Sequence, residues 1–413
     1  MKVDVAVLGA GIVGVSAALH LQARGRSVAL IDRNADAGAE TSYGNAGLIE
    51  RSSVVPYMFP RDLPTVVRFA LNGSTEARYH LAALPRLAPF LLRYFLASSP
   101  AGVARVTAGA RPLIERCLVE HEALMEAADA TRLMRRIGWI KAFRRAKSRD
   151  EAFAEAEHLG RLGLRIDTLD PAALAEREPH LGAGPIGALH FRDPVAVSDP
   201  GALVRAYNAL FVKRGGRFLQ GDARSLENSG GWRVATTSGT LEARDVVVAL
   251  GPWSDLVFRK LGYRLPFAVK RGYHRHFRPK GNAVLNNPVL DVDGGYLLAP
   301  MAQGIRLTTG VEFALRDAPP TPVQMGRAEP VARGLFPLGE AVEPVPWMGA
   351  RPCLPDMLPV LGPAPRHRGL WFDFGHQHHG LTLGPVSGRL LAEMMTGEAA
   401  FTDATPYSVE RFG

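Results

Sequence analysis

Cysteine is scarce in this chain of 413 residues, which contains only Cys117 and Cys353. Two cysteines cannot build a disulfide framework, and they cannot supply a cysteine-based metal site. Neither one belongs to a CxxC pair, so we expect both to be buried thiols rather than redox centres.

Long apolar runs are also missing, and we expect no leader segment. A strand pattern already begins at residues 1–3, which leaves no room for the charged and apolar regions of a secretory signal. No apolar run approaches the roughly 18 residues that a membrane span requires. These absences predict a cytoplasmic protein.

Acidic residues are outnumbered, since 49 lysines and arginines stand against 40 aspartates and glutamates and give a net charge of +9. This balance favours an acidic partner, which can be a carboxylate substrate, an anionic cofactor, an anionic membrane surface or a nucleic acid. The 47% hydrophobic content is enough for a large core and predicts two domains.

The amino-terminal segment carries the strongest motif. A strand over residues 3–8 runs into the sequence GAGIVG and an apolar helix that ends at Gly25, and a second strand over 27–31 stops at Asp32. This is a GxGxxG fingerprint in the strand–turn–helix–strand context of a dinucleotide site. Gly9 permits the tight turn, Gly11 the approach of a pyrophosphate, and Gly14 the close packing of helix and strand, while Asp32 can accept a ribose hydroxyl.

A second GxGxxG string at residues 182–187 is not interpreted as a nucleotide site, because a strand rather than a helix is predicted after it. One fingerprint leaves no separate nicotinamide site. We therefore expect the bound cofactor to carry out the redox chemistry itself.

The rest of the chain predicts helices and strands in mixed order. Residues 61–130 read as helical with interruptions at several prolines, among them Pro89 and Pro112. Residues 245–250 predict a buried parallel strand, residues 264–312 an antiparallel region, and residues 385–396 a helix.

Several side chains are candidates for the chemistry. Arg351 lies in a turn-rich segment that suits capture of a carboxylate, although a surface pair with Asp356 is the alternative. Tyr296 could hydrogen-bond the same carboxylate or could be a core aromatic, and Tyr273 is a similar case. His378 belongs to a histidine-rich segment, 376–379, for which a polar pocket is favoured over a metal site.

Two further stretches allow contact with larger partners. Residues 135–149 contain seven basic residues and no acidic one, and we expect a solvated rim there rather than a nucleic-acid site. The apolar segment 87–96 is too short to span a bilayer; we expect core or pocket wall first and a membrane contact second.

Taken together, these motifs resemble the FAD-dependent D-amino-acid dehydrogenase family, within the wider group of glycine oxidase and D-amino-acid oxidase. The resemblance covers nearly the whole chain and includes residues 9–14 with Asp32, 40–47, 246–254, 271–273, 349–352 and 375–382. Departures from the pattern occur at His378, where glycine oxidase has an arginine, and near residues 43–44.

The resemblance implies an α/β fold with a Rossmann-like FAD domain and an α+β substrate domain that contains an antiparallel sheet. The expected FAD domain comprises residues 1–50, 197–258 and 349–413, and the substrate domain residues 51–196 and 259–348. Arg351, Tyr296, Tyr273 and His378 are the expected catalytic residues. The FAD site is expected to comprise Gly9, Gly11, Ile12, Val13, Gly14, Asp32, Arg33, Thr41, Ser42, Asn45, Ala46, Gly47, Ala223, Gly251, Trp253, Gly380, Leu381 and Thr382.

The function implied is FAD-dependent oxidation of a D-amino acid or a D-proline-type secondary amine, by hydride transfer from Cα to flavin N5. The charge and the 87–96 segment suggest that electrons pass to a membrane quinone, with peripheral contact at the membrane. The alternatives are a glycine- or sarcosine-type oxidase that uses oxygen, and a flavin-carrying subunit of a heteromeric complex. No metal and no nucleic acid are expected.

Overall fold

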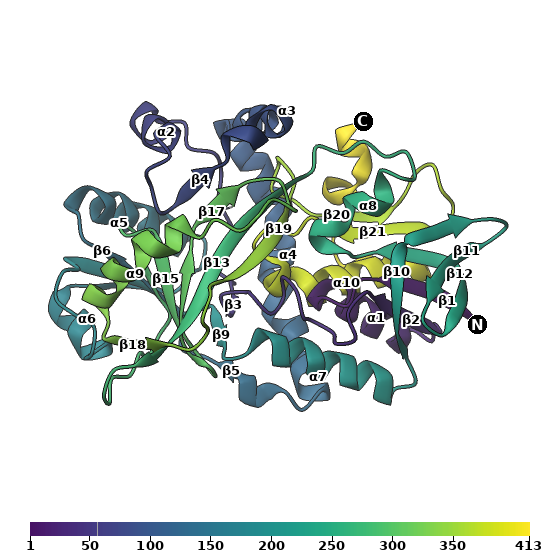
Figure 1. Cartoon of the computed structure of the whole chain (residues 1–413), viewed down its shortest axis with the longest axis horizontal. Coiled ribbons are helices and arrows are strands. Elements are labelled where there is room, and N and C mark those ends of the chain that lie inside the picture. Colours follow the sequence, from purple (N-terminus) through teal and green to yellow (C-terminus); the bar gives the residue numbers. More distant parts are fainter. Residues whose placement is uncertain (56) are drawn as a thin grey trace.

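The computed structural model describes residues 1–55 and 57–413, and the strands form two large sheets and one small sheet (Figure 1). The first sheet has a parallel centre in the order β10–β2–β1–β12–β21, and β11 and β20 join it antiparallel. Its strands are β1 (Lys2–Leu8), β2 (Val28–Asp32), β10 (Arg217–Asn228), β11 (Trp232–Thr236), β12 (Gly239–Val248), β20 (Val360–Pro363) and β21 (Leu370–Phe374).

The centre of this sheet is buried because its strands are continuous apolar runs. Val246, Val247 and Val248 have no accessible surface, as expected for a strand that is covered on both faces. The covering helix α1 (Ile12–Ala23) packs against α7 (Pro200–Lys213) and α10 (Gly380–Thr396). A β-carbon at Gly388 would lie 2.7 Å from the backbone nitrogen of Ala17, so glycine allows α1 and α10 to approach closely.

The second sheet is mostly antiparallel and follows the order β4–β17–β13–β16–β15–β14–β6–β8–β7, with β18 and β19 also paired to β13. Its long strand β13 therefore connects several parts of the sheet. The strands are β4 (Ala77–Tyr79), β6 (Trp139–Phe143), β7 (Ile166–Leu169), β8 (Gly187–Phe191), β13 (Ala268–Pro279), β14 (Val289–Asp291), β15 (Tyr296–Met301), β16 (Gly304–Thr309), β17 (Val311–Phe313), β18 (Leu338–Ala341) and β19 (Trp347–Cys353).

The remaining elements surround these sheets. A small sheet contains β3 (Leu48–Ile49), β5 (Met134–Arg135) and β9 (Val195–Val197). The other helices are α2 (Leu63–Ala70), α3 (Leu84–Ala97), α4 (Pro100–Ala127), α5 (Ala146–Arg161), α6 (Pro171–Arg177), α8 (Asp255–Phe258) and α9 (Val323–Leu335), with 3₁₀ turns at Leu81–Ala83, Thr131–Leu133, Gly251–Trp253, Thr405–Tyr407 and Val409–Phe412. Figure 1 shows α2 and α3 together at one end of the second sheet.

Two prolines that were predicted to interrupt helices do not do so. Pro89 lies inside α3 and Pro112 lies inside α4, which runs unbroken over 28 residues. Each proline removes one backbone hydrogen bond, but α4 packs along α10, and this tertiary contact offsets the loss. Helix α10 also begins earlier than expected, at Gly380 rather than at Pro385.

The second GxGxxG string, at residues 182–187, runs into the strand β8 and not into a helix, as expected from the sequence. The predicted division into two domains stays a prediction, and the boundary placed at residue 349 falls within β19, a strand of the second sheet. Within residues 1–55 and 57–413, no helix combines the length and apolarity that a membrane crossing requires.

Candidate functional site

The glycine-rich turn after β1 needs two of its glycines for steric reasons. Gly9 has a φ of +105°, and a β-carbon there would lie 2.5 Å from the carbonyl oxygen of Ala249. A β-carbon at Gly14 would lie 1.8 Å from the carbonyl oxygen of Gly9. Both positions therefore exclude any side chain, and they hold α1 against the strands.

Gly11 has a different reason to be glycine. Its backbone has ordinary angles, φ −73° and ψ 177°, and a β-carbon would approach only the Ser42 hydroxyl, at 3.2 Å. The missing side chain leaves the first turn of α1 open to the cavity, and Ser42 accepts a hydrogen bond from the Ile12 N–H at 3.0 Å. An open helix N-terminus of this kind binds phosphate through its N–H groups and its dipole.

Asp32 connects the end of β2 to this turn. One carboxylate oxygen accepts the Ala10 N–H at 2.7 Å, and the other accepts the Asn34 N–H at 2.9 Å. The neighbouring Arg33 stacks over the Trp253 ring at 4.0 Å and pairs with Glu40. Asp32 and Glu40 both line the cavity, where a carboxylate suits a ribose.

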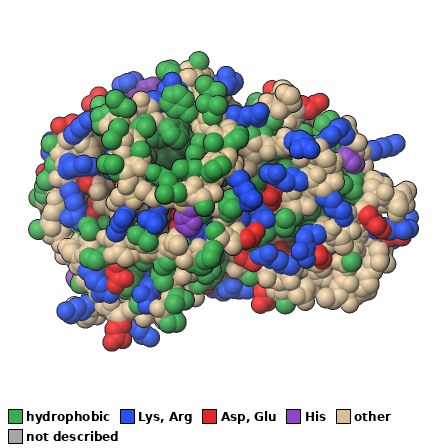
Figure 2. Space-filling view, turned by 45° about the horizontal axis from the view of Figure 1, so that its top comes forward, with side chains coloured by type: hydrophobic (Ala, Val, Ile, Leu, Met, Phe, Trp, Pro, Cys, Tyr) green, Lys and Arg blue, Asp and Glu red, His purple; other side chains and the backbone are tan. Residues whose placement is uncertain are grey.

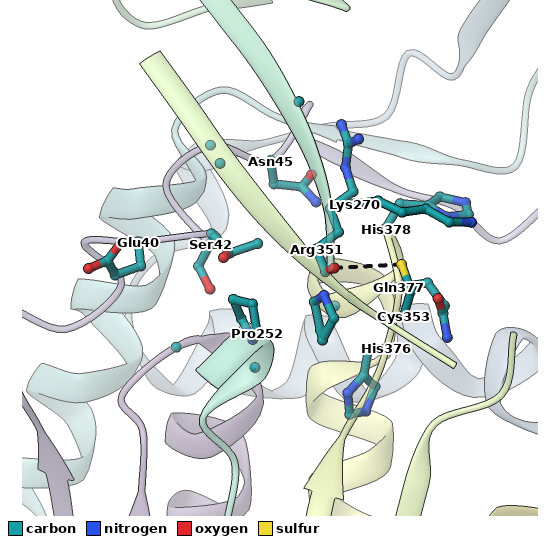
Figure 3. Close-up of a pocket in the computed structure, with 18 of the residues that line it drawn as sticks. Glu40, Ser42, Asn45, Pro252, Lys270, Arg351, Cys353, His376, Gln377 and His378 are labelled. Carbon is teal, nitrogen blue, oxygen red and sulfur yellow. Dashed lines mark hydrogen bonds between the residues drawn. The ribbon is translucent and has the colours of Figure 1, made fainter. Parts of the chain in front are cut away.

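A cavity of about 1180 Å³ runs from this turn to strands β13 and β19 of the second sheet. It exceeds the roughly 300–1,000 Å³ of a usual small-ligand pocket, so it has room for a dinucleotide and a second molecule. Figure 3 shows Glu40 and Ser42 on one side of it and Arg351, Lys270, Cys353 and His378 on the other.

Most of the residues predicted to bind the cofactor line this cavity. They are Gly9, Gly11, Ile12, Val13, Asp32, Arg33, Thr41, Ser42, Asn45, Ala46, Ala223, Gly251, Trp253, Gly380 and Leu381. Three of the predicted residues do not line the cavity: Gly14, Gly47 and Thr382. They support its wall through packing and hydrogen bonds. A β-carbon at Gly47 would lie 2.4 Å from the Val197 carbonyl oxygen, and the Thr382 hydroxyl accepts the Glu50 N–H at 3.0 Å.

The first turn of α10 contributes Gly380 and Leu381 to the cavity wall. A buried histidine of α4, His121, holds the Leu381 carbonyl with Nε2 at 2.6 Å, and its Nδ1 lies 3.2 Å from the Tyr207 hydroxyl. Burial lowers the pKa of His121 from 6.5 to about 4. The ring is therefore neutral at pH 7, and Nε2 is the nitrogen that carries the proton.

At the other end, Arg351 points its guanidinium across β13. A β-carbon at Gly272 would lie 2.7 Å from one guanidinium nitrogen, so the absence of a side chain at Gly272 makes the space that Arg351 fills. Among the described residues, no carboxylate lies within salt-bridge distance of this guanidinium, and no side-chain hydrogen bond engages it. The alternative pairing of Arg351 with Asp356 is wrong, because Asp356 pairs with Arg411 at 2.6 Å.

Lys270 stands directly opposite Arg351 in the β13–β19 register and is 6% exposed. Its ammonium lies 4.1 Å from the ring of Tyr94 and 5.4 Å from that of Phe313. Burial, with Arg351 nearby, lowers the pKa of Lys270. The sequence reasoning missed this residue, although the alternation of β13 places it on the same face as Gly272.

His378 lines the same end of the cavity. Burial and the positive charges of His379, Arg351 and Lys270 lower its pKa well below the ordinary value of 6.5, so it is neutral. The Cys353 thiol is also buried, and burial raises its pKa. It donates to the Arg351 carbonyl oxygen at 3.6 Å (dashed line in Figure 3).

The hydroxyls of the two tyrosines predicted at the site both have partners within the protein. Tyr296 lies in the core, and its hydroxyl donates to Asp291 at 2.9 Å instead of reaching the cavity. The Tyr273 hydroxyl donates to Glu312 at 2.9 Å and accepts the Thr321 N–H. Tyr273 is among the residues that line the cavity, but Glu312 and Thr321 engage its hydroxyl. Tyr296 does not line the cavity, because strand alternation turns it away from the face that Gly295 and Leu297 present there.

The comparisons with known proteins agree with this geometry. A family model described as FAD dependent oxidoreductase (DAO) matches residues 4–394. The chain belongs to the FAD-dependent oxidoreductase family. The D-amino-acid oxidase of Bradyrhizobium diazoefficiens is 28% identical over 99% of this chain and 98% of its own, and the D-amino acid dehydrogenase of Paramagnetospirillum magneticum is 30% identical with the same coverage.

Among solved structures, the glycine oxidase from Geobacillus kaustophilus has a TM-score of 0.76 and 23% identity, and the match covers 99% of this chain and 98% of that one. Its likeness confirms the expected fold class. The family confirms FAD as the cofactor of this FAD-dependent oxidoreductase, and the site fits it. Gly11 leaves a cradle that a β-carbon would fill, and the first turn of α1 supplies donors for the pyrophosphate.

No group of three or more potential metal ligands occurs among the residues that the structure describes, and this includes the histidines at 376, 378 and 379. The residues that sequence reasoning missed, Lys270 and Gly272, lie on one face of β13. The same face also carries His274 and His276, so the lysine does not stand out in the sequence of the strand.

Proposed function

We propose that this FAD-dependent oxidoreductase oxidises the amine of a D-amino acid, or of a D-proline-type secondary amine, at Cα. The observation that carries the proposal is the unpartnered guanidinium of Arg351, which faces the same cavity as the glycine turn. A planar guanidinium with free donors binds a carboxylate bidentately. The curated relatives named above are a D-amino-acid oxidase and a D-amino acid dehydrogenase, which supports the D configuration.

FAD, when bound, supplies the two-electron acceptor. Arg351 holds the substrate carboxylate and thereby fixes the position of Cα. The positive charges of Arg351 and Lys270 disfavour an ammonium group in the cavity, so they favour the neutral amine whose lone pair assists the loss of hydride. The neutral ring of His378 adds no charge that competes for the carboxylate.

Anaerobic mixing of the FAD-loaded enzyme with single D- and L-amino acids tests the proposal. We expect D-amino acids to bleach the flavin absorbance, while the L-enantiomers do not. Replacing Arg351 by alanine should raise the concentration needed for half-maximal bleaching about 100-fold or more, since a charged pair in a buried site contributes about 3 kcal/mol. The variant should keep its FAD. Equal half-saturation in Arg351→Ala and wild type would contradict the carboxylate role.

We also propose that the outer face of α2 and α3 rests on a membrane with anionic lipids, where a quinone can accept the electrons. No residue of α2 is buried; Leu63 is 72% exposed, and Leu92 and Leu96 of α3 are each 60% exposed. Figure 2 shows hydrophobic side chains around a hollow on this side. Exposed arginines accompany them, namely Arg61, Arg68, Arg86 and Arg93.

The inner faces of these two helices reach the catalytic cavity through Phe69 and Tyr94, so a membrane-bound acceptor would lie near its wall. Such a pattern of exposed leucines and arginines is typical of interfacial helices. We expect the protein to sediment with vesicles that contain phosphatidylglycerol and not with pure phosphatidylcholine vesicles. Replacing Leu92 and Leu96 by glutamate should abolish sedimentation. Sedimentation that persists in this double variant would exclude this surface as the membrane contact.

A further inference from the structure

The substrate end of the cavity holds more positive charge than one carboxylate can neutralise. Lys270 and Arg351 face each other in the register of adjacent strands, an arrangement that is destabilising for like charges. Burying an unpaired cation is also costly. Over residues 1–55 and 57–413, neither side chain has a carboxylate within salt-bridge distance.

Nearby groups do not compensate for this charge. Cys353 remains a neutral thiol, because burial raises its pKa. The aromatic rings of Tyr94 and Phe313 stabilise the Lys270 ammonium only in part, because a cation–π contact contributes far less than a hydrated or paired charge. A ligand is therefore the natural source of the missing negative charge.

The two charged ends also diverge. Arg351 lies on β19 and extends over Gly272, whereas Lys270 leans toward Phe313, its register partner on β17, and toward Tyr94 of α3. The strands β17 and β19 both pair with β13. One carboxylate held by Arg351 thus leaves Lys270 free for a separate anionic group.

We propose that Lys270 binds a second acidic group of the substrate, so that the preferred substrate is a D-amino acid with a carboxylate side chain. This inference rests on the proposed function, because Arg351 must hold the α-carboxylate for Lys270 to meet the side chain. Lys270 is then a determinant of specificity.

The isosteric pairs D-glutamate with D-glutamine and D-aspartate with D-asparagine test the inference on the FAD-loaded enzyme. Wild type should show a kcat/KM for the acidic member about 10- to 100-fold above that for the amide, as expected for one charge-assisted contact. Lys270→Met should remove this preference, chiefly by lowering kcat/KM for the acid. Lys270→Arg should keep part of it.

Lys147→Met is the matched control, because its side chain is 84% exposed on α5 and the net charge changes equally. FAD content and melting temperature of each variant establish that the fold is intact. If Lys270→Met lowers kcat/KM equally for the acid and for the amide, the inference is overturned. A changed flavin reduction potential with an unchanged acid-to-amide ratio would overturn it too, since Lys270 would then serve the cofactor.

Binding of glutarate and of butyrate, followed through the flavin spectrum, separates this inference from the proposed function. Neither compound carries an amine that can be oxidised. Tighter binding of glutarate, lost in Lys270→Met, would support the two-anion site even if no D-amino acid is turned over. Equal affinities would overturn the two-anion site even if D-amino acids are oxidised.

Discussion

The two ends of the cavity differ in what lines them. At the glycine turn the wall is formed by the first turn of α1, and at the opposite end it is formed by the charged side chains Lys270 and Arg351. The first end depends on backbone and on missing side chains. The second depends on two long side chains held on adjacent strands. Backbone donors recognise a cofactor part that does not vary, whereas side chains can change between relatives without disturbing the fold.

The largest expected effect separates two glycines of the same turn. Gly14→Ala places a β-carbon 1.8 Å from a backbone oxygen, and should destabilise the protein by about 4 kcal/mol or more. Gly11→Ala meets only the Ser42 hydroxyl at 3.2 Å, so the apoprotein should keep its stability within about 1 kcal/mol and yet lose FAD binding. Thermal melting of the apoprotein and titration with FAD measure the two effects.

Normal FAD affinity in Gly11→Ala would show that the pyrophosphate does not approach this turn. A soluble, stable Gly14→Ala variant would show that α1 can move away from β1. Either result would contradict the view that backbone and glycines determine one end of the cavity while side chains determine the other.

A smaller effect is expected at the other end. Gly272→Ala places a β-carbon 2.7 Å from the Arg351 guanidinium, which must turn away, so KM should rise about 10-fold with FAD affinity unchanged. Steady-state kinetics and FAD titration measure this. Gly160→Ala serves as the control, since its β-carbon would meet nothing within 4 Å and its kinetics should match wild type. An unchanged KM in Gly272→Ala would mean that the position of Arg351 is not set by this glycine.

How far the site could be predicted depends on which of these two ends is considered. The cofactor end could be predicted from the spacing of Gly9, Gly11, Gly14 and Asp32 in the sequence, because a tight turn with backbone donors has a local sequence motif. Arg351 was found from a resemblance and from a segment interpreted as turn-rich. That interpretation is wrong, because residues 347–353 form the strand β19. The direction of Tyr296 could not be predicted, because the side to which a strand residue points depends on register, which is set by distant pairing.

The fold shows the same division. The βαβ unit and the buried strand near residues 245–250 were predicted from continuous apolar runs. The continuation of α4 beyond Pro112 was not predicted, because the packing of α4 on α10 outweighs the effect of a local helix breaker. Lys270 was overlooked because its importance arises only from the position of Arg351 across the sheet.

The smallest expected effect concerns pH. Burial lowers the pKa of His121 from 6.5 to about 4, so below pH 6.5 the unfolded chain binds a proton that the folded chain does not bind until about pH 4. Stability should therefore fall between pH 6.5 and 4, by at most about 1.4 kcal/mol per pH unit for this group. His20 contributes in the same direction, because burial also lowers its pKa to about 4.

Denaturant unfolding at several pH values with FAD in excess measures this slope. His121→Gln should take up about one proton fewer on unfolding near pH 5.5, while His158→Gln, at an exposed position of α5, should behave as wild type. An unchanged slope in His121→Gln would mean that this ring does not support Leu381 in its neutral form.

The most direct test of the account compares cofactor and substrate binding in Arg351→Ala under anaerobic conditions. We expect the variant to bind FAD as tightly as wild type, and its flavin to be bleached by a D-amino acid only at about 100-fold higher concentration or above. Loss of FAD together with loss of bleaching, or bleaching at wild-type concentrations, would contradict the assignment of Arg351 to the substrate carboxylate.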